Sequence, residues 1–289
     1  METSELLKKV RKIEIKTRGL SRHIFSGEYH SAFKGRGMAF SEVREYMPGD
    51  EIRTIDWNVT ARFNHPYVKV FEEERELTVM LLVDVSASNE FGTKVQFKNE
   101  MITEICAVLA FSAIQNNDKV GVIFFTDRIE KFIPPKKGRS HILLIVRELI
   151  DFKPEHKKTN IEEGLRYFNN AIKKRSTAFL ISDFMDSEFE HALKIANKKH
   201  DIIALKIYDI RESEIPSIGL IRFIDEESGE MKWIDTSDEK VRKQFHFESL
   251  RHEVKLKDIF TKSGVDYTNI SADESYVKPL MLLFKKRGK

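Results

Sequence analysis

The segment Leu77–Asp84, with the sequence LTVMLLVD, decides the fold of this chain. Up to its final aspartate it is almost entirely apolar, which is typical of a strand buried on both faces of a parallel sheet. A second such run, Thr177–Ile181, lies later in the chain and is followed by Ser182 and Asp183. Each run therefore places an aspartate just past the carboxyl end of a strand, which is the edge where open α/β sheets bind ligands.

Strand-like and helix-like segments alternate from residue 77 onward. This alternation predicts an α/β fold, with an open, mostly parallel sheet covered by helices on both faces. Residues 76–289 are expected to form the main domain with a C-terminal hairpin and helices, and residues 1–75 an N-terminal helix and arm that pack on it. The other expected strands are 67–71, 120–125, 129–133, 202–208, 220–224 and 231–234, and the expected helices are 5–18, 94–114, 140–150, 160–174, 188–199, 239–262 and 276–286.

Hydroxyl side chains accompany the two aspartates. Ser86 and Ser88 alternate after Asp84, so both hydroxyls can face the atom that its carboxylate faces, and Thr159 opens an amphipathic segment that predicts a helix. Together with Asp183 these are hard oxygen ligands, which favour Mg²⁺, Mn²⁺ or Ca²⁺ over zinc or copper. We interpret them as a metal site. An Asp or Glu side chain of a partner protein can replace a water molecule bound to that metal. The alternative is that these side chains only cap the next helix.

The order of these residues resembles the metal-ion-dependent adhesion site of von Willebrand factor A domains. That site combines D-x-S-x-S, a distant Thr in T-N-x-x-x-G-L and an Asp after a later strand. Phe184 is a departure, because these domains commonly have Gly after the last Asp. The resemblance implies a von Willebrand factor A-like fold and a magnesium-dependent docking site. The matching ligand positions are Asp84, Ser86, Ser88, Thr159 and Asp183.

A second segment, upstream of the first strand, is similar to the signature of domain-of-unknown-function family 58. It contains the long string R-x-Y-x-P-G-D-x-x-R-x-I-D-W. Members of this family carry a von Willebrand factor A-like domain and are often encoded beside MoxR-type AAA+ ATPases. The resemblance covers nearly the whole chain, and it implies a MoxR-like ATPase as a partner in the assembly or maturation of another complex. The signature residues are Arg44, Tyr46, Pro48, Gly49, Asp50, Arg53, Asp56, Trp57 and Arg62.

The signature segment has two interpretations. Its Arg and Asp side chains mix charge signs densely around Tyr46 and Trp57. Such a pattern is typical of a buried salt-bridge and aromatic network, which here would pack the arm onto the sheet, and paired charges usually satisfy each other. The segment can instead be a recognition surface beside the metal. We adopt the structural interpretation.

Charge and cysteine content narrow the classes of function. Lys and Arg number 49 against 46 Asp and Glu, a net charge of +3, which disfavours a nucleic-acid partner because such proteins need a clearly basic face. The single cysteine, Cys106, rules out an intrachain disulfide and fits a reducing compartment. No apolar run has the length of a transmembrane helix, and the N-terminus is acidic rather than signal-like. We therefore expect a cytoplasmic protein.

These observations favour a non-enzymatic, divalent-metal-dependent protein-binding module. One rival is a metal-dependent phosphohydrolase with Asp84 as nucleophile. Such enzymes need a second carboxylate as acid and base, and this chain has Ser86 at that position. The other rival is a structural scaffold whose metal site is idle.

Overall fold

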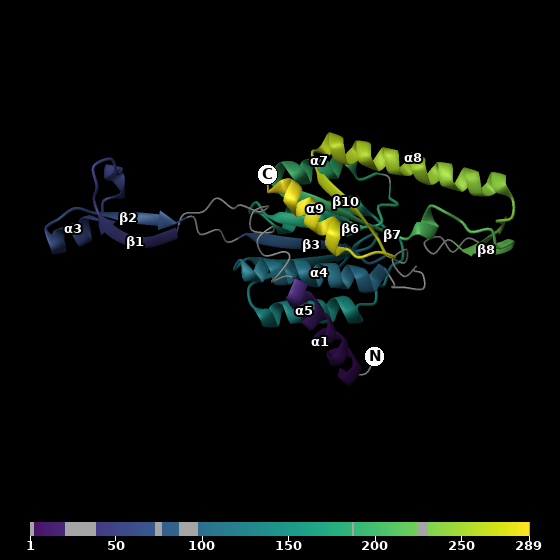
Figure 1. The fold of residues 1–289 in the computed structure, drawn as a ribbon, viewed down its shortest axis with the longest axis horizontal. Coiled ribbons are helices and arrows are strands. Elements are labelled where there is room, and N and C mark those ends of the chain that lie inside the picture. The colour runs from purple at the N-terminus through teal and green to yellow at the C-terminus, as the bar shows by residue number, and fades with distance from the viewer. Residues whose placement is uncertain are drawn as a thin grey trace. The chain divides into compact units, whose positions relative to one another are not determined.

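The computed structural model describes residues 3–20, 39–72, 77–86, 98–186, 188–224 and 231–288 (Figure 1). By their contacts, residues 34–77 form one compact unit and the rest of the chain forms a second, main unit. By these contacts the N-terminal helix belongs to the main unit.

The main unit is built on a six-stranded sheet with the order β10-β7-β6-β3-β4-β5. All neighbouring strands are parallel except β4 and β5, which are antiparallel. The two strands that precede the aspartates, β3 and β6, lie side by side at the centre, which explains their apolar sequences. The strand bounds are β3 Thr78–Asp84, β4 Lys119–Phe125, β5 Ile129–Lys136, β6 Thr177–Ser182, β7 Asp201–Tyr208 and β10 Asp266–Ser271.

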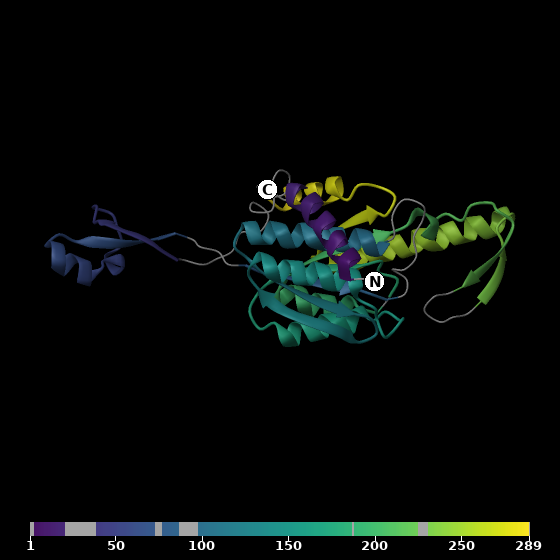
Figure 2. The same ribbon diagram turned by 90° about the horizontal axis from the view of Figure 1, so that it is seen from below.

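Helices cover both faces of this sheet, which confirms the predicted α/β architecture (Figures 1 and 2). Met80 of β3 points into a core shared with α6, α7 and α8, whereas Phe179 of β6 meets Phe284 of α9 on the other face. The N-terminal helix α1, purple in Figure 2, lies across α4, where Lys16 pairs with Glu104 at 2.5 Å. The helix bounds are α1 Thr3–Leu20, α4 Lys98–Gln115, α5 Arg139–Asp151, α6 Ile161–Ala171, α7 Glu190–Lys199, α8 Glu239–Ser263 and α9 Val277–Arg287.

Strand β10 is an element that the sequence does not predict. Its sequence, DYTNIS, is polar, and most of its residues are only half-buried. It pairs with β7 at one edge of the sheet. An edge strand does not need the continuous apolar run of a central strand, so the pattern that reveals β3 is absent here. The predicted hairpin is present as β8 (Leu220–Ile224) and β9 (Met231–Asp235), with its connecting residues outside the described part of the chain.

The smaller unit contains an antiparallel strand pair, β1 (Ala39–Glu45) and β2 (Tyr67–Glu72). The short helices η2 (Ile52–Thr54) and α3 (Trp57–Phe63) lie between these strands in the chain. Helix α3 begins at this point because the Asp56 carboxylate accepts hydrogen bonds from two amides of its first turn.

His200 predicts a pH-dependent stability of the main unit. Its ring is buried against Phe168, and its Nδ1 lies 3.0 Å from Ser176 Oγ. Burial, with Lys199 and Arg175 nearby, lowers the pKa of His200 to about 4. The unfolded chain, with a pKa of about 6.5, therefore takes up this proton first as the pH falls. Lowering the pH from 6.5 to 4 should favour unfolding by up to about 1.4 kcal/mol per pH unit.

Urea unfolding of the wild type and His200→Gln at about pH 7 and about pH 5 measures this contribution. The wild type should lose more stability between the two pH values than the variant does. Equal losses in both proteins would assign the acid sensitivity to other groups.

Candidate metal-binding site

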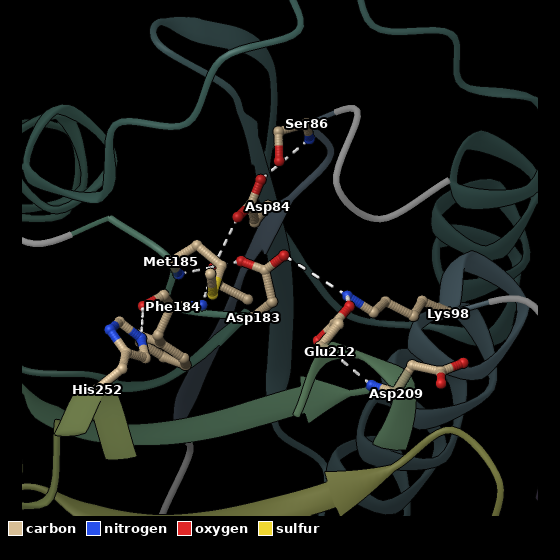
Figure 3. A network of polar contacts seen from close by, with 10 residues as sticks. Asp84, Ser86, Lys98, Asp183, Phe184, Met185, Asp209, Glu212 and His252 are labelled. Atoms are coloured by element: carbon tan, nitrogen blue, oxygen red, sulfur yellow. Dashed lines mark hydrogen bonds and ion pairs between the residues drawn. The ribbon is translucent and has the colours of Figure 1, made fainter. Parts of the chain in front are cut away.

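The two predicted aspartates come together at the carboxyl edge of the sheet (Figure 3). Asp84 is the last residue of β3, and Asp183 follows the last residue of the neighbouring strand β6. Both side chains are almost completely buried, with 0% and 1% of their surface exposed. Two carboxylates that are far apart in sequence therefore share one small site.

Hydrogen bonds orient the Asp84 carboxylate. Its Oδ1 accepts a hydrogen bond from the amide of Ser86 at 3.0 Å, and its Oδ2 accepts one from the Ser182 hydroxyl at 2.7 Å. Ser182 Oγ in turn accepts a hydrogen bond from the amide of Phe184 at 3.0 Å. Ser182 was not among the predicted site residues. Its place at the end of β6, beside Asp183, is the signal that could have identified it.

The electrostatics of Asp84 are unfavourable for its charge. Burial first, and then the negative charge of Asp183, raise the pKa of Asp84 to about 7, against the opposing effect of the hydrogen bonds from Ser182 and Ser86. The neutral form of this carboxylate is therefore favoured more than in an exposed aspartate. A positive charge next to it would stabilise the charged form.

Lys98 is a site residue that the sequence analysis missed. It is the first described residue of α4, and its side chain is completely buried. Its ammonium lies 3.6 Å from Asp183 Oδ2 and forms an ion pair with Glu212 (Figure 3). Burial raises the pKa of Glu212, while Lys98 acts in the opposite direction. Glu212 is held in turn by a capping box with Asp209 in the short helix η4 (Ile210–Glu212).

The residue after Asp183 has an unusual backbone. Phe184 has φ of 58°, a left-handed conformation that favours glycine. Its side chain is completely buried and contacts Phe189 and Phe260, with ring centroids 5.7 and 5.2 Å apart. The backbone thus adopts the conformation that a glycine at this position would favour, while the phenyl ring joins the hydrophobic core.

The other two predicted ligands are Ser88 and Thr159. Ser88 lies outside the described residues. Thr159 is half-buried and precedes Asn160, whose side chain caps α6 by accepting a hydrogen bond from the Glu163 amide. The amide of Ile161 donates to Asp186 Oδ2 at 2.9 Å, so the start of α6 is tied to the loop that follows Asp183.

The signature residues occupy the smaller unit. Arg44 and Asp50 form a two-pronged ion pair, with donor–acceptor distances of 2.7 and 2.9 Å. This pairing lowers the pKa of Asp50, and Gly49 provides the φ of 113° that the intervening turn requires. Tyr46 is half-buried, Pro48 lies in the turn, and Asp56 caps α3. The signature side chains exposed to solvent are Pro48, Arg53, Trp57 and Arg62.

In the described part of the chain, no three His, Cys, Asp or Glu side chains gather as metal ligands. A metal at Asp84 and Asp183 would therefore depend on hydroxyl groups and water for its remaining ligands. No described helix is both long enough and apolar enough to cross a lipid bilayer.

Solved structures of other proteins are similar to this chain. The crystal structure of an aerotolerance-related membrane protein from Bacteroides fragilis, carrying multiple mutations to serine, aligns with 73% of this chain and 99% of its own, with 17% identity and a TM-score of 0.51. The VWA domain of SpRpn10 aligns with 73% of this chain and 93% of its own, with 12% identity and a TM-score of 0.37. The strand order and the helices on both faces confirm the expected von Willebrand factor A-like fold.

Comparison with related sequences identifies the family of this chain. The uncharacterized protein Rv1480 of Mycobacterium tuberculosis (strain ATCC 25618 / H37Rv) is 24% identical over 99% of this chain and 91% of its own. The uncharacterized protein YeaD of Bacillus subtilis (strain 168) is 27% identical over 38% of this chain and 25% of its own. The model of the protein family of unknown function DUF58 matches residues 42–255, which include all the signature residues and both site aspartates, and this chain therefore belongs to that family.

Proposed function

We propose that this protein is a non-enzymatic, divalent-metal-dependent protein-binding module. The observation that carries the proposal is the buried pair of Asp84 and Asp183, in which Asp84 has a pKa raised to about 7. Two buried carboxylates at one sheet edge attract a divalent cation, which would lower that pKa and offset the cost of burying their charge.

The donor set fits a hard cation such as Mg²⁺, with Mn²⁺ or Ca²⁺ as alternatives. Asp84 and Asp183 supply carboxylate oxygens, and Ser86, Ser88 and Thr159 are the hydroxyl donors that the family resemblance adds. When bound, the cation would supply a Lewis-acidic position for an Asp or Glu of the partner. The protein's own residues orient the carboxylates through Ser182 and the Ser86 amide, and burial excludes bulk water.

The class of partner comes from the family resemblance, which favours a MoxR-like AAA+ ATPase, and the cytoplasmic setting is the expectation from the sequence. A hydrolytic role is not proposed, because Ser86 occupies the position where an acid/base carboxylate would be needed and Lys98 is engaged with Glu212. Asp84 is therefore given the role of a metal ligand rather than of a nucleophile.

Calorimetric titration of Mg²⁺ and Mn²⁺ into metal-free protein tests the proposal. The wild type should bind one ion, and Asp84→Asn should weaken binding by about 100-fold or more, since second-shell changes alone cost about 10–100-fold. Asp118→Asn is the matched control, because Asp118 is equally buried but precedes β4, at the opposite edge of the sheet. Its affinity should stay at the wild-type value.

A partner carboxylate can be needed to complete the site. The titration is therefore repeated with acetate present at millimolar concentration. If neither the wild type alone nor the wild type with acetate binds metal, metal-dependent docking is wrong for this protein.

A further inference from the structure

Helix α8 has an apolar stripe on the face opposite the core. Leu256, Ile259 and Phe260 are buried beneath the C-terminal half of this helix. Phe247, Leu250 and Val254 have 60%, 49% and 69% of their surface exposed. Figure 1 shows α8, in yellow-green, extending at its N-terminal end past the six-stranded sheet toward β8.

These exposed residues form one continuous line along the helix. Spacings of three and four residues place side chains on the same helical face. The spacing from Phe247 to Leu250 is three residues, and the spacing from Leu250 to Val254 is four. A contiguous apolar stripe bordered by charges is typical of an interaction surface.

Charged pairs continue the same line at both ends of the stripe. At the N-terminal end, Glu239 pairs with Lys243 at 2.7 Å. At the C-terminal end, Asp258 pairs with Lys262 at 2.6 Å. All four side chains are more than half exposed. These seven residues therefore run negative, positive, three apolar, negative, positive along the helix, and the exposed Arg251 lies beside the apolar residues.

This order is complementary to itself when it is read in the opposite direction. In an antiparallel pair of α8 helices centred between Leu250 and Arg251, each residue faces one that is equally far on the other side of the centre. Phe247 then lies opposite Val254. The facing charged pairs are Glu239 with Lys262 and Lys243 with Asp258.

We propose that α8 docks against α8 of a second copy of this chain, antiparallel and about a two-fold axis near Leu250. A two-fold interface uses the same surface on both copies, which the palindromic order of apolar and charged residues satisfies. A parallel pair in register would instead place Lys243 next to Lys243 and Asp258 next to Asp258. The charges therefore select the antiparallel arrangement. This inference is independent of the metal site.

Charge reversal tests the facing pairs. Sedimentation equilibrium at protein concentrations from about 1 to about 100 µM, the range for a small interface, should show the mass rising from 33.8 kDa toward twice that value. Lys243→Glu and Asp258→Lys should each weaken association by about 10-fold. Both changes together should restore it, although they also bring like charges together within each helix.

If the double variant associates as the wild type does, residues 243 and 258 of opposite charge must face each other across the interface. A wild type that stays monomeric, or a double variant as weak as the two single changes combined, would overturn the proposal. A dimer that survives Leu250→Glu unchanged would also overturn it, since that dimer would use another surface.

A cysteine at the two-fold axis tests the geometry directly. Leu250→Cys should form a disulfide between copies under mild oxidation, because the two copies of position 250 lie beside the axis and are only one residue, about 1.5 Å along the helices, out of register. Gln244→Cys is the control, because this position is also exposed on α8 but lies roughly 20 Å from its own copy along the helices. The native Cys106 is completely buried, so the introduced thiol is the accessible one in the described part of the chain. Equal cross-linking of both variants would contradict the predicted pairing.

Discussion

Replacing Lys98 with Met should lower the free energy of unfolding by about 3–5 kcal/mol, the usual cost of removing one partner of a buried ion pair. The Lys98 ammonium is the positive charge that the described structure places between Asp183 and Glu212 (Figure 3). Met fills a similar volume but leaves the buried Asp183 and the mostly buried Glu212 without this cation. The loss should appear in urea unfolding at neutral pH.

Two controls isolate the charge effect. The double variant Lys98→Met/Glu212→Gln removes the cation and one carboxylate together, and it should recover a large part of the lost stability. Lys16→Met removes a lysine that pairs with Glu104 but is half exposed, and it should cost less than about 1 kcal/mol. If Lys98→Met and Lys16→Met are equally mild, the buried ion pair does not stabilise the fold.

Phe184→Ala should destabilise the protein by about 3–5 kcal/mol, because it removes a fully buried aromatic ring from the core. The backbone adds a second, unusual expectation. At φ of 58° alanine is strained and glycine is not. Phe184→Gly should therefore be more stable than Phe184→Ala by about 1 kcal/mol, although glycine removes more of the side chain.

Phe168 provides the matched comparison for this ordering. It is equally buried, but it lies within helix α6, where the backbone is right-handed. There the alanine variant should be more stable than the glycine variant, because glycine gains more conformational freedom on unfolding. Urea unfolding of the four variants gives their free energies of unfolding. If alanine is more stable than glycine at both positions, the left-handed backbone of Phe184 imposes no cost.

The central part of this fold could be predicted from sequence because its signals are local. The apolar run of β3 and the aspartate at its end lie next to each other in the chain, and a parallel sheet brings strand ends to one edge. The encounter of Asp84 with Asp183 follows from that rule alone. The family and the von Willebrand factor A-like fold are confirmed, whereas the metal and the partner stay predictions.

Other features could not be predicted because they depend on contacts between distant residues. Lys98 stands in a polar stretch at the start of a helix, and nothing in its neighbourhood indicates that it meets Glu212 after β7. Strand β10 is polar because it lies at an edge of the sheet.

One feature of the signature segment agrees with the interpretation as a buried network, and another does not. Its Arg44–Asp50 pair forms as opposite charges suggest, yet Trp57 is 67% exposed in its own unit.

One hydrogen bond connects helix α8 to the carboxylate site, so binding at the site and self-association through α8 can be thermodynamically coupled. His252, on α8, has its Nε2 2.9 Å from the carbonyl oxygen of Phe184, the residue that directly follows Asp183. If an occupant of the carboxylate site shifts that peptide, it also biases the helix on which a second copy would dock. Linkage is then reciprocal: the factor by which the occupant changes self-association equals the factor by which self-association changes affinity for the occupant.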